Sequence, residues 1–404
     1  MIDLPEISTK KIVVKLTPKA EVLVKKGHPW IFDQSIAKQN TEGNSGDLVI
    51  LFDNRKNKFL AVGFYDPFSP IRIKILQANK PANINADWFN SKIQEAYNKR
   101  KPLLETATNS YRLIYGENDN LPSLVADVYD NVLVVKLYAQ FWFPYLKDIL
   151  PELLATSNTD TLVLRLSRNV QKEGNEFGLH DGQVIHGELE NEVVIFKEHG
   201  VLFSANVIKG HKTGYFLDHR ANRKKVGEMS NQKTVLDVFS YAGGFSVHAL
   251  AGGAKAVTSL DISAPALELA KENANLNPYT GKHYTIVGDA FDELEKLASQ
   301  RTRFDIVVFD PPSFAKSAIE VDRAINSYKK LAVLGVKLVN RGGTLVLASC
   351  SSRVTADVFF ELMEEVMQTT KTNYTVLEKT NHDIDHPIGF KEGAYLKCIY
   401  IRIN

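Results

Sequence analysis

The chain has 404 residues, of which 44% are hydrophobic and 24% charged, and its formal net charge is +2. This length exceeds the size at which one hydrophobic core usually stops growing, so we expect more than one domain, and the composition excludes disordered and fibrous classes. Only two cysteines are present, Cys350 and Cys398, and no apolar run suits a signal peptide or a membrane span. We therefore expect a cytoplasmic protein with reduced thiols and no membrane partner.

Positive charge gathers in two stretches of this nearly neutral chain. Residues 1–80 hold 13 lysines and arginines against 8 acidic residues. A second cluster has six cations beside the single acid Asp218: Lys209, Lys212, Arg220, Arg223, Lys224 and Lys225. Such patches fit a polyanion partner, and a solvated lysine-rich surface explains them equally well.

Residues 1–76 have the pattern of a small β-rich domain. Short apolar runs at 11–16, 47–52, 59–65 and 71–76 are separated by clusters of Asn, Gly, Asp, Pro and Ser, which is typical of strands joined by turns. A short helix is expected at 19–26. The pattern predicts a small barrel or sandwich.

Residues 77–195 are predicted to form a middle α/β domain. A helix is expected from Asp87 to about Lys101, and "SLVADVYDNVLVVKLY" predicts a hairpin that turns at its Asp-Asn pair. "PYLKDILPELLA" indicates a helix and "TLVLRLS" a strand. A further hairpin is expected in "EVVIFKEHGVLFSA".

From residue 196 to 404 we predict a third domain, in which strands and helices alternate from Thr234 onward. Strands are expected at 234–239, 256–262, 284–289, 304–310 and 343–349, with helices between them, and a terminal hairpin at 374–379 and 396–403. Alternation of nearly continuous apolar strands with helices predicts a parallel, doubly wound sheet covered on both faces. Ligands bind such sheets beyond the carboxyl ends of the strands, so polar residues there are functional candidates.

The first of these strands ends in "DVFSYAGGFS". A dinucleotide fingerprint would need G-x-G-x-x-G, but Phe239 and Tyr241 take positions where small residues are needed, and only Gly243 and Gly244 keep the loop tight. A loop with bulky side chains suits a cofactor without phosphates, such as S-adenosylmethionine, whose ammonium group Asp237 could hold. This disfavours a nicotinamide dehydrogenase.

Two more strands end in acidic residues. Asp261, in "LDIS" with Ser263, could accept the two ribose hydroxyls of the cofactor, and Asp289, in "GDA" with Ala290, could accept from the adenine amino group. Single aspartates often only cap helices. Recurrence at three strand ends favours a cofactor site.

The fourth strand ends in "DPPSF". Pro311 and Pro312 stiffen the exit from the strand, and Phe314 offers a flat face to a base. Asp310 could bond to the Watson–Crick edge of a flipped base. A rigid turn with no function is the alternative.

The fifth strand ends in "LVLASCSSR", which contains Cys350. Cysteine is more often buried and inert than reactive. However, this strand ends beside the Asp310 loop among serines, where a thiolate would face the same pocket. Position therefore favours a nucleophile.

These motifs resemble those of class I methyltransferases, and over nearly the whole chain the sequence is similar to the ribosomal RNA large subunit methyltransferase I family. The matching stretches include "KGHPWIF", "YGENDNLPSLVADVYDNVLVV", "KTGYFLDHRANR" and "HPIGFKEGAYLK". The resemblance implies an N-terminal PUA domain, a middle α/β domain, a Rossmann-like catalytic domain, S-adenosylmethionine as cofactor, and 5-methylcytosine in 23S rRNA as product.

The resemblance also implies roles for individual residues. Cys350 would attack carbon 6 of a flipped cytosine, while Asp310 would bond to its N3 side and itself lie near the cofactor. The segment "KTGYFLDHR" would approach the cofactor through Tyr215, Phe216, Asp218 and Arg220, and Lys212, Pro311, Pro312 and Phe314 would contact the RNA. No DNA partner and no metal site are expected, and a homodimer stays open.

One departure and two alternatives remain. Many RNA cytosine carbon-5 methyltransferases place a second cysteine where this chain has Ser313, so the group that releases the product is open. A base N-methyltransferase would use the "DPPSF" loop and leave Cys350 a bystander. An RNA-binding assembly protein with a vestigial cofactor site is the alternative that is not an enzyme.

Overall fold

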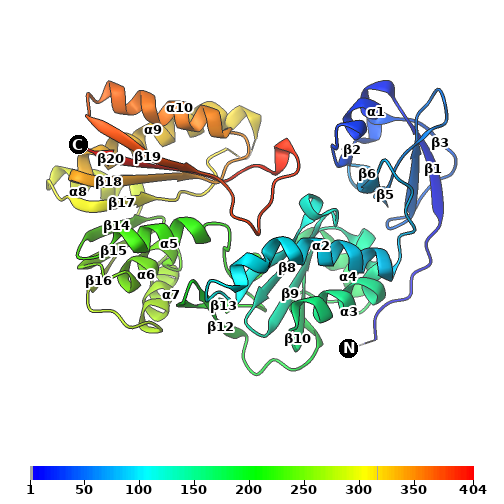
Figure 1. Cartoon of the computed structure of the whole chain (residues 1–404), viewed down its shortest axis with the longest axis horizontal. Helices are drawn as coiled ribbons and strands as arrows, with labels where there is room; N and C mark the ends of the chain where they lie inside the picture. Colours follow the sequence, from blue (N-terminus) through cyan, green and yellow to red (C-terminus); the bar gives the residue numbers. More distant parts are fainter. Residues whose placement is uncertain (1–2, 316) are drawn as a thin grey trace. The chain divides into compact units, whose positions relative to one another are not determined.

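The structure is a computed structural model that describes residues 3–315 and 317–404. Contacts divide the chain into two units (Figure 1). The first unit runs to Lys197 and also takes in residues 204–217 and 384–391. The second unit holds residues 198–203, 218–383 and 392–404. The first passage of the chain between the units follows Lys197, and the predicted division into three domains stays a prediction.

The N-terminal residues form a six-stranded sheet in the order β2-β6-β5-β4-β1-β3. In β1 buried and exposed residues alternate, so Ile12, Val14 and Leu16 point into the core. The expected strands and the short helix are all present. The elements are β1 (Lys11–Leu16), α1 (Pro18–Lys25), β2 (Trp30–Ile31), β3 (Ile36–Gln39), β4 (Leu48–Phe52), β5 (Phe59–Tyr65) and β6 (Ile73–Ala78).

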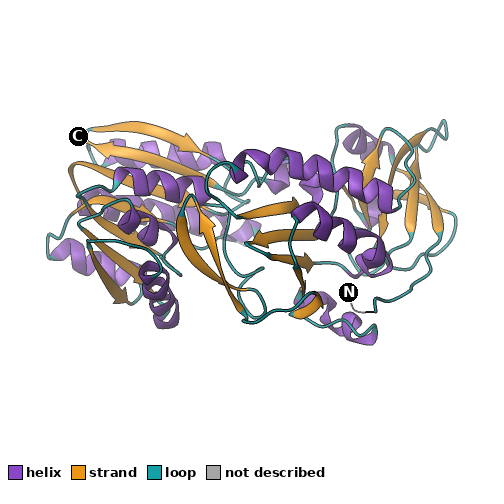
Figure 2. Ribbon diagram, turned by 60° about the horizontal axis from the view of Figure 1, so that its bottom comes forward, coloured by secondary structure: helices purple, strands orange, loops and turns teal. Residues whose placement is uncertain are grey.

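The middle region of the first unit is a five-stranded sheet, ordered β11-β10-β9-β8-β7, on which α2 and α3 pack. Its strands and helices are shown by class in Figure 2. The predicted hairpin is confirmed as the antiparallel pair β8–β9, with Asp130 at the turn in the left-handed region. The elements are α2 (Ala86–Leu104), β7 (Ser110–Tyr115), β8 (Leu124–Tyr129), β9 (Val132–Leu137), α3 (Leu146–Ser157), β10 (Thr161–Leu166), α4 (Gln171–Glu176) and β11 (Gln183–His186).

The two sheets of the first unit share a hydrophobic core. Phe64 of β5 is fully buried, and its ring centroid lies 5.0 Å from that of Phe141 and 4.9 Å from those of Trp142 and Tyr145. Buried aromatic rings supply a large apolar area, so this contact stabilises the packing of the N-terminal sheet on the middle region.

The hairpin predicted after the middle region is confirmed as β12 (Val193–Glu198) and β13 (Val201–Asn206).

The second unit is built on a seven-stranded sheet in the order β16-β15-β14-β17-β18-β20-β19. The five strands β14 to β18 run parallel, and the antiparallel hairpin β19–β20 completes the sheet, as predicted. The strands are β14 (Thr234–Val238), β15 (Ala256–Asp261), β16 (Lys282–Val287), β17 (Phe304–Phe309), β18 (Val339–Ser349), β19 (Tyr374–Thr380) and β20 (Lys397–Ile403).

Helices cover both faces of this sheet, α5, α6 and α7 on one side and α9 and α10 on the other (Figure 1). Helix α10 was not among the expected elements, although Phe359, Met363 and Val366 repeat with helical spacing and are buried. No helix among the described residues is long and apolar enough to cross a membrane. The helices are α5 (Arg220–Met229), α6 (Gly244–Ala251), α7 (Ala264–Asn275), α8 (Ala290–Ser299), α9 (Val321–Leu338) and α10 (Ala356–Thr369).

Candidate active site

Five neighbouring strands bring the predicted polar residues to one edge of the seven-stranded sheet. Asp237 lies in β14, Asp261 ends β15, and Asp289 follows β16. Asp310 follows β17, and Cys350 follows β18. Parallel neighbours end on the same side of a sheet, so the strand order sets these residues in one row.

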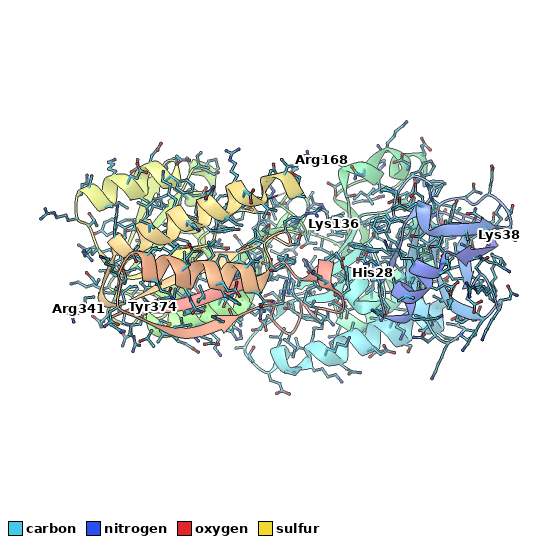
Figure 3. The ribbon with its side chains drawn as sticks, turned by 90° about the horizontal axis from the view of Figure 1, so that it is seen from above. His28, Lys38, Lys136, Arg168, Arg341 and Tyr374 are labelled. Carbon is cyan, nitrogen blue, oxygen red and sulfur yellow. The ribbon has the colours of Figure 1, made fainter. Side chains whose placement is uncertain are left out.

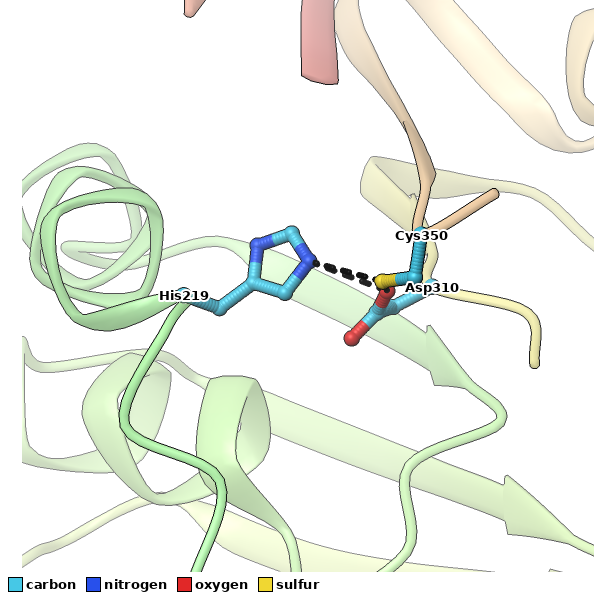
Figure 4. Close-up of side chains that lie close together, drawn as sticks. All are labelled: His219, Asp310 and Cys350. Atoms are coloured by element: carbon cyan, nitrogen blue, oxygen red, sulfur yellow. Dashed lines mark hydrogen bonds and ion pairs between the residues drawn. The ribbon is translucent and has the colours of Figure 1, made fainter. Parts of the chain in front are cut away.

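At one end of the row, Cys350 and Asp310 meet His219 (Figure 4). The Cys350 sulfur lies 3.7 Å from Oδ1 of Asp310 and 3.7 Å from Nε2 of His219. The same Nε2 lies 3.1 Å from Oδ1 of Asp310. His219 is buried, whereas Cys350 and Asp310 are half-buried, so the cluster borders solvent. The three groups combine a nucleophile with two groups that exchange protons, and their ligand atoms also lie close enough together to hold a metal ion.

His219 is the member of this cluster that the sequence reasoning missed, although it selected both neighbours of that residue. His219 stands directly before α5, and its Nδ1 lies 3.1 Å from Nδ2 of Asn222 in the first turn. Burial disfavours the charged imidazole, but the carboxylates of Asp310 and Asp218 together outweigh burial and raise the pKa of His219. The pair His219 and Asn222, three residues apart at a helix start, was the available sequence signal. Nothing local shows that this histidine meets a cysteine 131 residues away.

Cys350 is held by the loop that follows β18. The hydroxyl of Ser351 donates to the carbonyl of Ala315, and the buried ammonium of Lys397 donates to three backbone carbonyls, those of Ser351, Val354 and Tyr395. Burial raises the pKa of Cys350 well above its usual value, and the carboxylates of Asp310 and Asp218 raise it further. The thiol is therefore the resting form at neutral pH. Burial lowers the pKa of Lys397 to about 8.

Asp237, the predicted partner of the cofactor's ammonium group, is fully buried. Its Oδ2 accepts hydrogen bonds from the backbone amide of Ser246 at 2.9 Å and from the Ser246 hydroxyl at 2.7 Å, whereas its Oδ1 has no hydrogen-bond partner. Burial, assisted by the carboxylates of Asp310 and Asp261, raises the pKa of Asp237 to about 7, although the Ser246 hydrogen bonds oppose the rise. An orphaned buried oxygen among acids fits a cationic ligand, as the ammonium and sulfonium groups of S-adenosylmethionine would provide.

The loop between β14 and α6 has an unusual backbone. Phe239 and Tyr241 take positive φ angles of 61° and 47°, which bulky residues rarely adopt. The side chain of Asp261 helps to hold the loop in place, because its Oδ2 accepts a hydrogen bond from the backbone amide of Tyr241 at 2.9 Å. Gly243 has a φ of 76°, and a Cβ there would lie 2.7 Å from Cβ of Ala270, so only glycine fits. Strain of this kind concentrates at ligand sites.

The other two acidic residues of the row already accept backbone hydrogen bonds. Oδ1 of Asp261 accepts from the amide of Ser263 at 2.9 Å, which leaves lone pairs for further donors. Asp289 caps α8 through Oδ1, which accepts from the amides of Phe291 and Asp292, while Ala290 is buried at the start of that helix. Helix capping thus accounts for one oxygen of Asp289. The assignments of Asp261 and Asp289 to ribose and adenine stay predictions.

The "DPPSF" loop lies against an aromatic cluster. Pro311 is buried and Pro312 is exposed. The half-buried ring of Phe314 lies 5.1 Å from that of Tyr328 and 6.4 Å from those of Phe239 and Phe291. Phe314 is therefore partly engaged in packing, and its predicted contact with a base is left to the exposed part of the ring.

The segment "KTGYFLDHR" is divided between the two units. In the first unit, the backbone amide of Tyr215 donates to the Tyr129 hydroxyl, and the Tyr215 side chain is buried. The Lys212 carbonyl accepts from Lys136 Nζ at 2.7 Å, and Phe216 is exposed. The roles of these three residues toward the cofactor and the RNA stay predictions.

Asp218 and Arg220 belong to the second unit. Asp218 accepts a hydrogen bond from the Tyr395 hydroxyl at 2.7 Å. The fully buried Arg220 donates to Asp383 at 3.4 Å. Asp218 lies near enough to the cluster to affect both Cys350 and His219 electrostatically.

The second basic cluster is not one exposed patch, which corrects the expectation from its charge. Arg220 and Arg223 are buried, and Arg223 forms a bidentate pair with Glu198 at 2.7 and 2.6 Å. Of the four lysines in the cluster, Lys209, Lys224 and Lys225 pair with glutamates on the surface. Buried charges must be paired, so the two arginines serve the fold rather than an RNA surface.

Comparisons with known proteins agree with this architecture. Residues 117–398 match the family described as S-adenosylmethionine-dependent methyltransferase, and residues 14–78 match the PUA-like domain. Two solved methyltransferase structures share the fold over 98% of this chain and all of their own: one from Streptococcus mutans has a TM-score of 0.80 at 22% identity, and one complexed with SAH has 0.81 at 23%.

Curated relatives match the chain along its whole length. The Ribosomal RNA large subunit methyltransferase of Deinococcus radiodurans is 40% identical over 99% of both chains. The Ribosomal RNA large subunit methyltransferase I of Alteromonas mediterranea is 32% identical over 97% of this chain and 98% of its own. The chain, with its PUA-like domain and its S-adenosylmethionine-dependent methyltransferase domain, therefore belongs to the ribosomal RNA large subunit methyltransferase I family.

Proposed function

We propose that this protein methylates carbon 5 of a cytosine in large-subunit ribosomal RNA, with Cys350 as a covalent nucleophile. The observation that carries the proposal is the 3.7 Å contact between the Cys350 sulfur and the Asp310 carboxylate. Both residues stand at the ligand edge of a sheet that also presents the orphaned oxygen of Asp237.

Carbon 5 of cytosine is a weak nucleophile, and the pair Cys350–Asp310 could activate it. Addition of the sulfur to carbon 6 breaks the aromatic system, and a proton delivered to N3 from the Asp310 side turns carbon 5 into an enamine carbon. S-adenosylmethionine supplies an electrophilic methyl group. Loss of the carbon-5 proton then expels the thiolate and restores the ring.

Ribosomal RNA as substrate is supported by the names of the relatives and by the charge of the N-terminal domain. Both curated relatives named above are ribosomal RNA large subunit methyltransferases. In the PUA-like domain, lysines are exposed on several elements, among them Lys38, labelled in Figure 3, and Lys11, Lys25 and Lys26. Exposed cations of this kind contact the phosphate backbone. We infer 23S rRNA as the partner.

RNA that contains 5-fluorocytidine at the target site tests the covalent mechanism. Fluorine at carbon 5 cannot leave as a cation, so the adduct with the enzyme should persist and migrate as a stable protein–RNA complex. Cys350→Ala should give no adduct, whereas Cys398→Ala, a change of the other, fully buried cysteine, should still give one. Normal methyl transfer by Cys350→Ala would overturn the proposal.

Methylation of an exocyclic or ring nitrogen is the second candidate. It is favoured by the stiff Asp310-Pro311-Pro312 exit from β17, which could hold a base without a covalent bond. Mass spectrometry of the methylated nucleoside separates the two products. The N-methyl product would also predict that Cys350→Ala keeps its activity.

A further inference from the structure

We infer that His219 is a third catalytic residue, whose Nε2–H donates a hydrogen bond to the Cys350 sulfur as the thiolate forms, and that Asn222 fixes this orientation of the ring. The inference rests on the proposed function, because it assigns a partner to the nucleophile named there. Nε2 of His219 contacts both reacting groups, because it lies 3.1 Å from Asp310 Oδ1 and 3.7 Å from Cys350 Sγ.

A chain of hydrogen bonds decides which ring nitrogen carries the hydrogen. Oδ1 of Asn222 accepts from the Thr380 hydroxyl at 2.7 Å and from the Tyr400 hydroxyl at 3.0 Å. The amide group Nδ2 therefore faces Nδ1 of His219 at 3.1 Å and donates to it. Nδ1 then accepts, and the neutral ring carries its hydrogen on Nε2. The protonated ring carries a hydrogen there as well, so Nε2 is a donor in both states.

A hydrogen-bond donor at this position stabilises the Cys350 thiolate, which the rest of the site disfavours. In the resting site, burial and the carboxylates of Asp310 and Asp218 all oppose ionisation of the Cys350 thiol. The nearby ammonium of Lys397 is engaged with three backbone carbonyls. The Nε2 hydrogen of His219 reaches the sulfur directly, and a hydrogen bond to an anion is about twice as strong as a neutral one.

The proton balance of the addition step follows from the same distances. The S–H bond of Cys350 breaks, and its proton passes to Oδ1 of Asp310, 3.7 Å away. The sulfur keeps the electron pair and uses it for the bond to carbon 6, while the π pair of the C5–C6 bond moves into the ring. N3 takes the proton from Asp310. The His219 hydrogen stays on Nε2 throughout and shifts its bond from Asp310 to the sulfur when Asp310 is protonated.

Alkylation of the native enzyme by iodoacetamide tests the pairing without RNA. Cys398 is fully buried, so native-state alkylation reports on Cys350, which peptide mass spectrometry verifies. His219→Leu should lower the alkylation rate at pH 8 by about tenfold or more and move the pH midpoint upward, because the variant loses a hydrogen bond to the thiolate and bonds to a charged group are the strong ones. His219→Gln keeps an amide donor and should recover much of the rate. His180→Leu, at an exposed histidine of the first unit, is the matched control.

A measurement on the unaltered protein covers the case in which His219→Leu does not fold. Long-range nitrogen–proton NMR correlations of histidine-labelled enzyme, assigned by comparison with His219→Gln, should show the Nε2–H form for His219. An Nδ1–H tautomer would overturn the inference. An unchanged alkylation profile in His219→Leu that still binds S-adenosylmethionine would also overturn it, as would wild-type alkylation that depends on a chelator, since a metal ion would then occupy the three groups.

The adduct and alkylation experiments together distinguish a failure of the proposed function from a failure of the role of His219. If wild-type enzyme forms no adduct with 5-fluorocytidine RNA while His219→Leu still shifts the alkylation profile, the His219–Cys350 pairing stands and the cytosine carbon-5 mechanism falls. If the adduct forms equally fast in wild type and His219→Leu, the mechanism stands and the role of His219 falls.

Discussion

The sulfur of Cys350 and Oδ1 of Asp310 lie 3.7 Å apart, although 40 residues separate them in the chain. They meet because β17 and β18 are parallel neighbours, with Phe309 paired to Leu347, so both strands end at the same edge. The contact sets an anion beside a thiol. Together with burial, this carboxylate raises the pKa of Cys350, and in the proposed chemistry it accepts the thiol proton.

Asp310→Asn should make the Cys350 thiol more reactive and methyl transfer slower. Removal of the carboxylate charge lowers the pKa of Cys350, so alkylation by iodoacetamide at pH 7.5 should become severalfold faster, while methyl transfer should fall by about 100-fold or more for lack of a proton donor to N3. Alkylation rates across pH and methyl incorporation into RNA measure the two effects. Slower alkylation would mean that the carboxylate activates the thiol in the resting enzyme.

Asp237→Asn should stabilise the protein and abolish cofactor binding. The pKa of Asp237 is raised to about 7 in the folded state from 3.8, so above pH 3.8 the unfolded state gains by ionisation, and folding stability falls as the pH rises toward 7. The penalty is fully present above pH 7, with an upper limit of about 4 kcal/mol at 1.4 kcal/mol per pKa unit. Thermal melts of the apoenzyme at pH 8 should show a higher Tm for the variant, and the gain should shrink at pH 5.

Binding of S-adenosylmethionine should release protons near neutral pH. A cation beside the orphaned oxygen of Asp237 would lower the pKa of that carboxyl from about 7, so about half a proton per site should be released at pH 7 and less at pH 8. Calorimetry in two buffers with different ionisation enthalpies measures this release. No buffer dependence at pH 7, with tight binding, would place the ammonium group elsewhere.

Arg223 and Lys224 are sequence neighbours with opposite expected roles. Arg223→Met leaves the buried Glu198 carboxylate without its bidentate partner and should cost about 3–5 kcal/mol in unfolding free energy. Lys224→Ala, at an exposed position, should change stability by less than about 0.5 kcal/mol. Urea unfolding compares the two. Equal stability of both variants, with weaker RNA binding by Arg223→Met, would restore Arg223 to an RNA surface.

Local sequence patterns were sufficient to predict the strands and helices in which apolar residues recur at regular intervals. The alternation of apolar strands with helices after Thr234 predicted the parallel sheet, and because parallel strands end at one edge it also predicted that Asp237, Asp310 and Cys350 would share that edge. The hairpin β8–β9 followed from its Asp-Asn turn. Helix α10 carried a readable helical pattern and was overlooked.

Local patterns could not predict which charged side chains are buried or which distant residues pair with them. Charge counting placed Arg220 and Arg223 on a basic surface, whereas Asp383 and Glu198, distant in the chain, pair with them in the interior. Likewise, residues 204–217 and 384–391 belong to the first unit although most of their sequence neighbours belong to the second.

The sequence by itself determined the type of sheet, the row of acids at its edge and the cysteine that ends β18, because these depend on local periodicity and on where strands stop. Only the tertiary structure brought His219 to Cys350 and set Asn222 behind the ring. That arrangement depends on how α5 packs beside the sheet and on hydroxyl groups from Thr380 and Tyr400, which no local pattern connects to the cysteine.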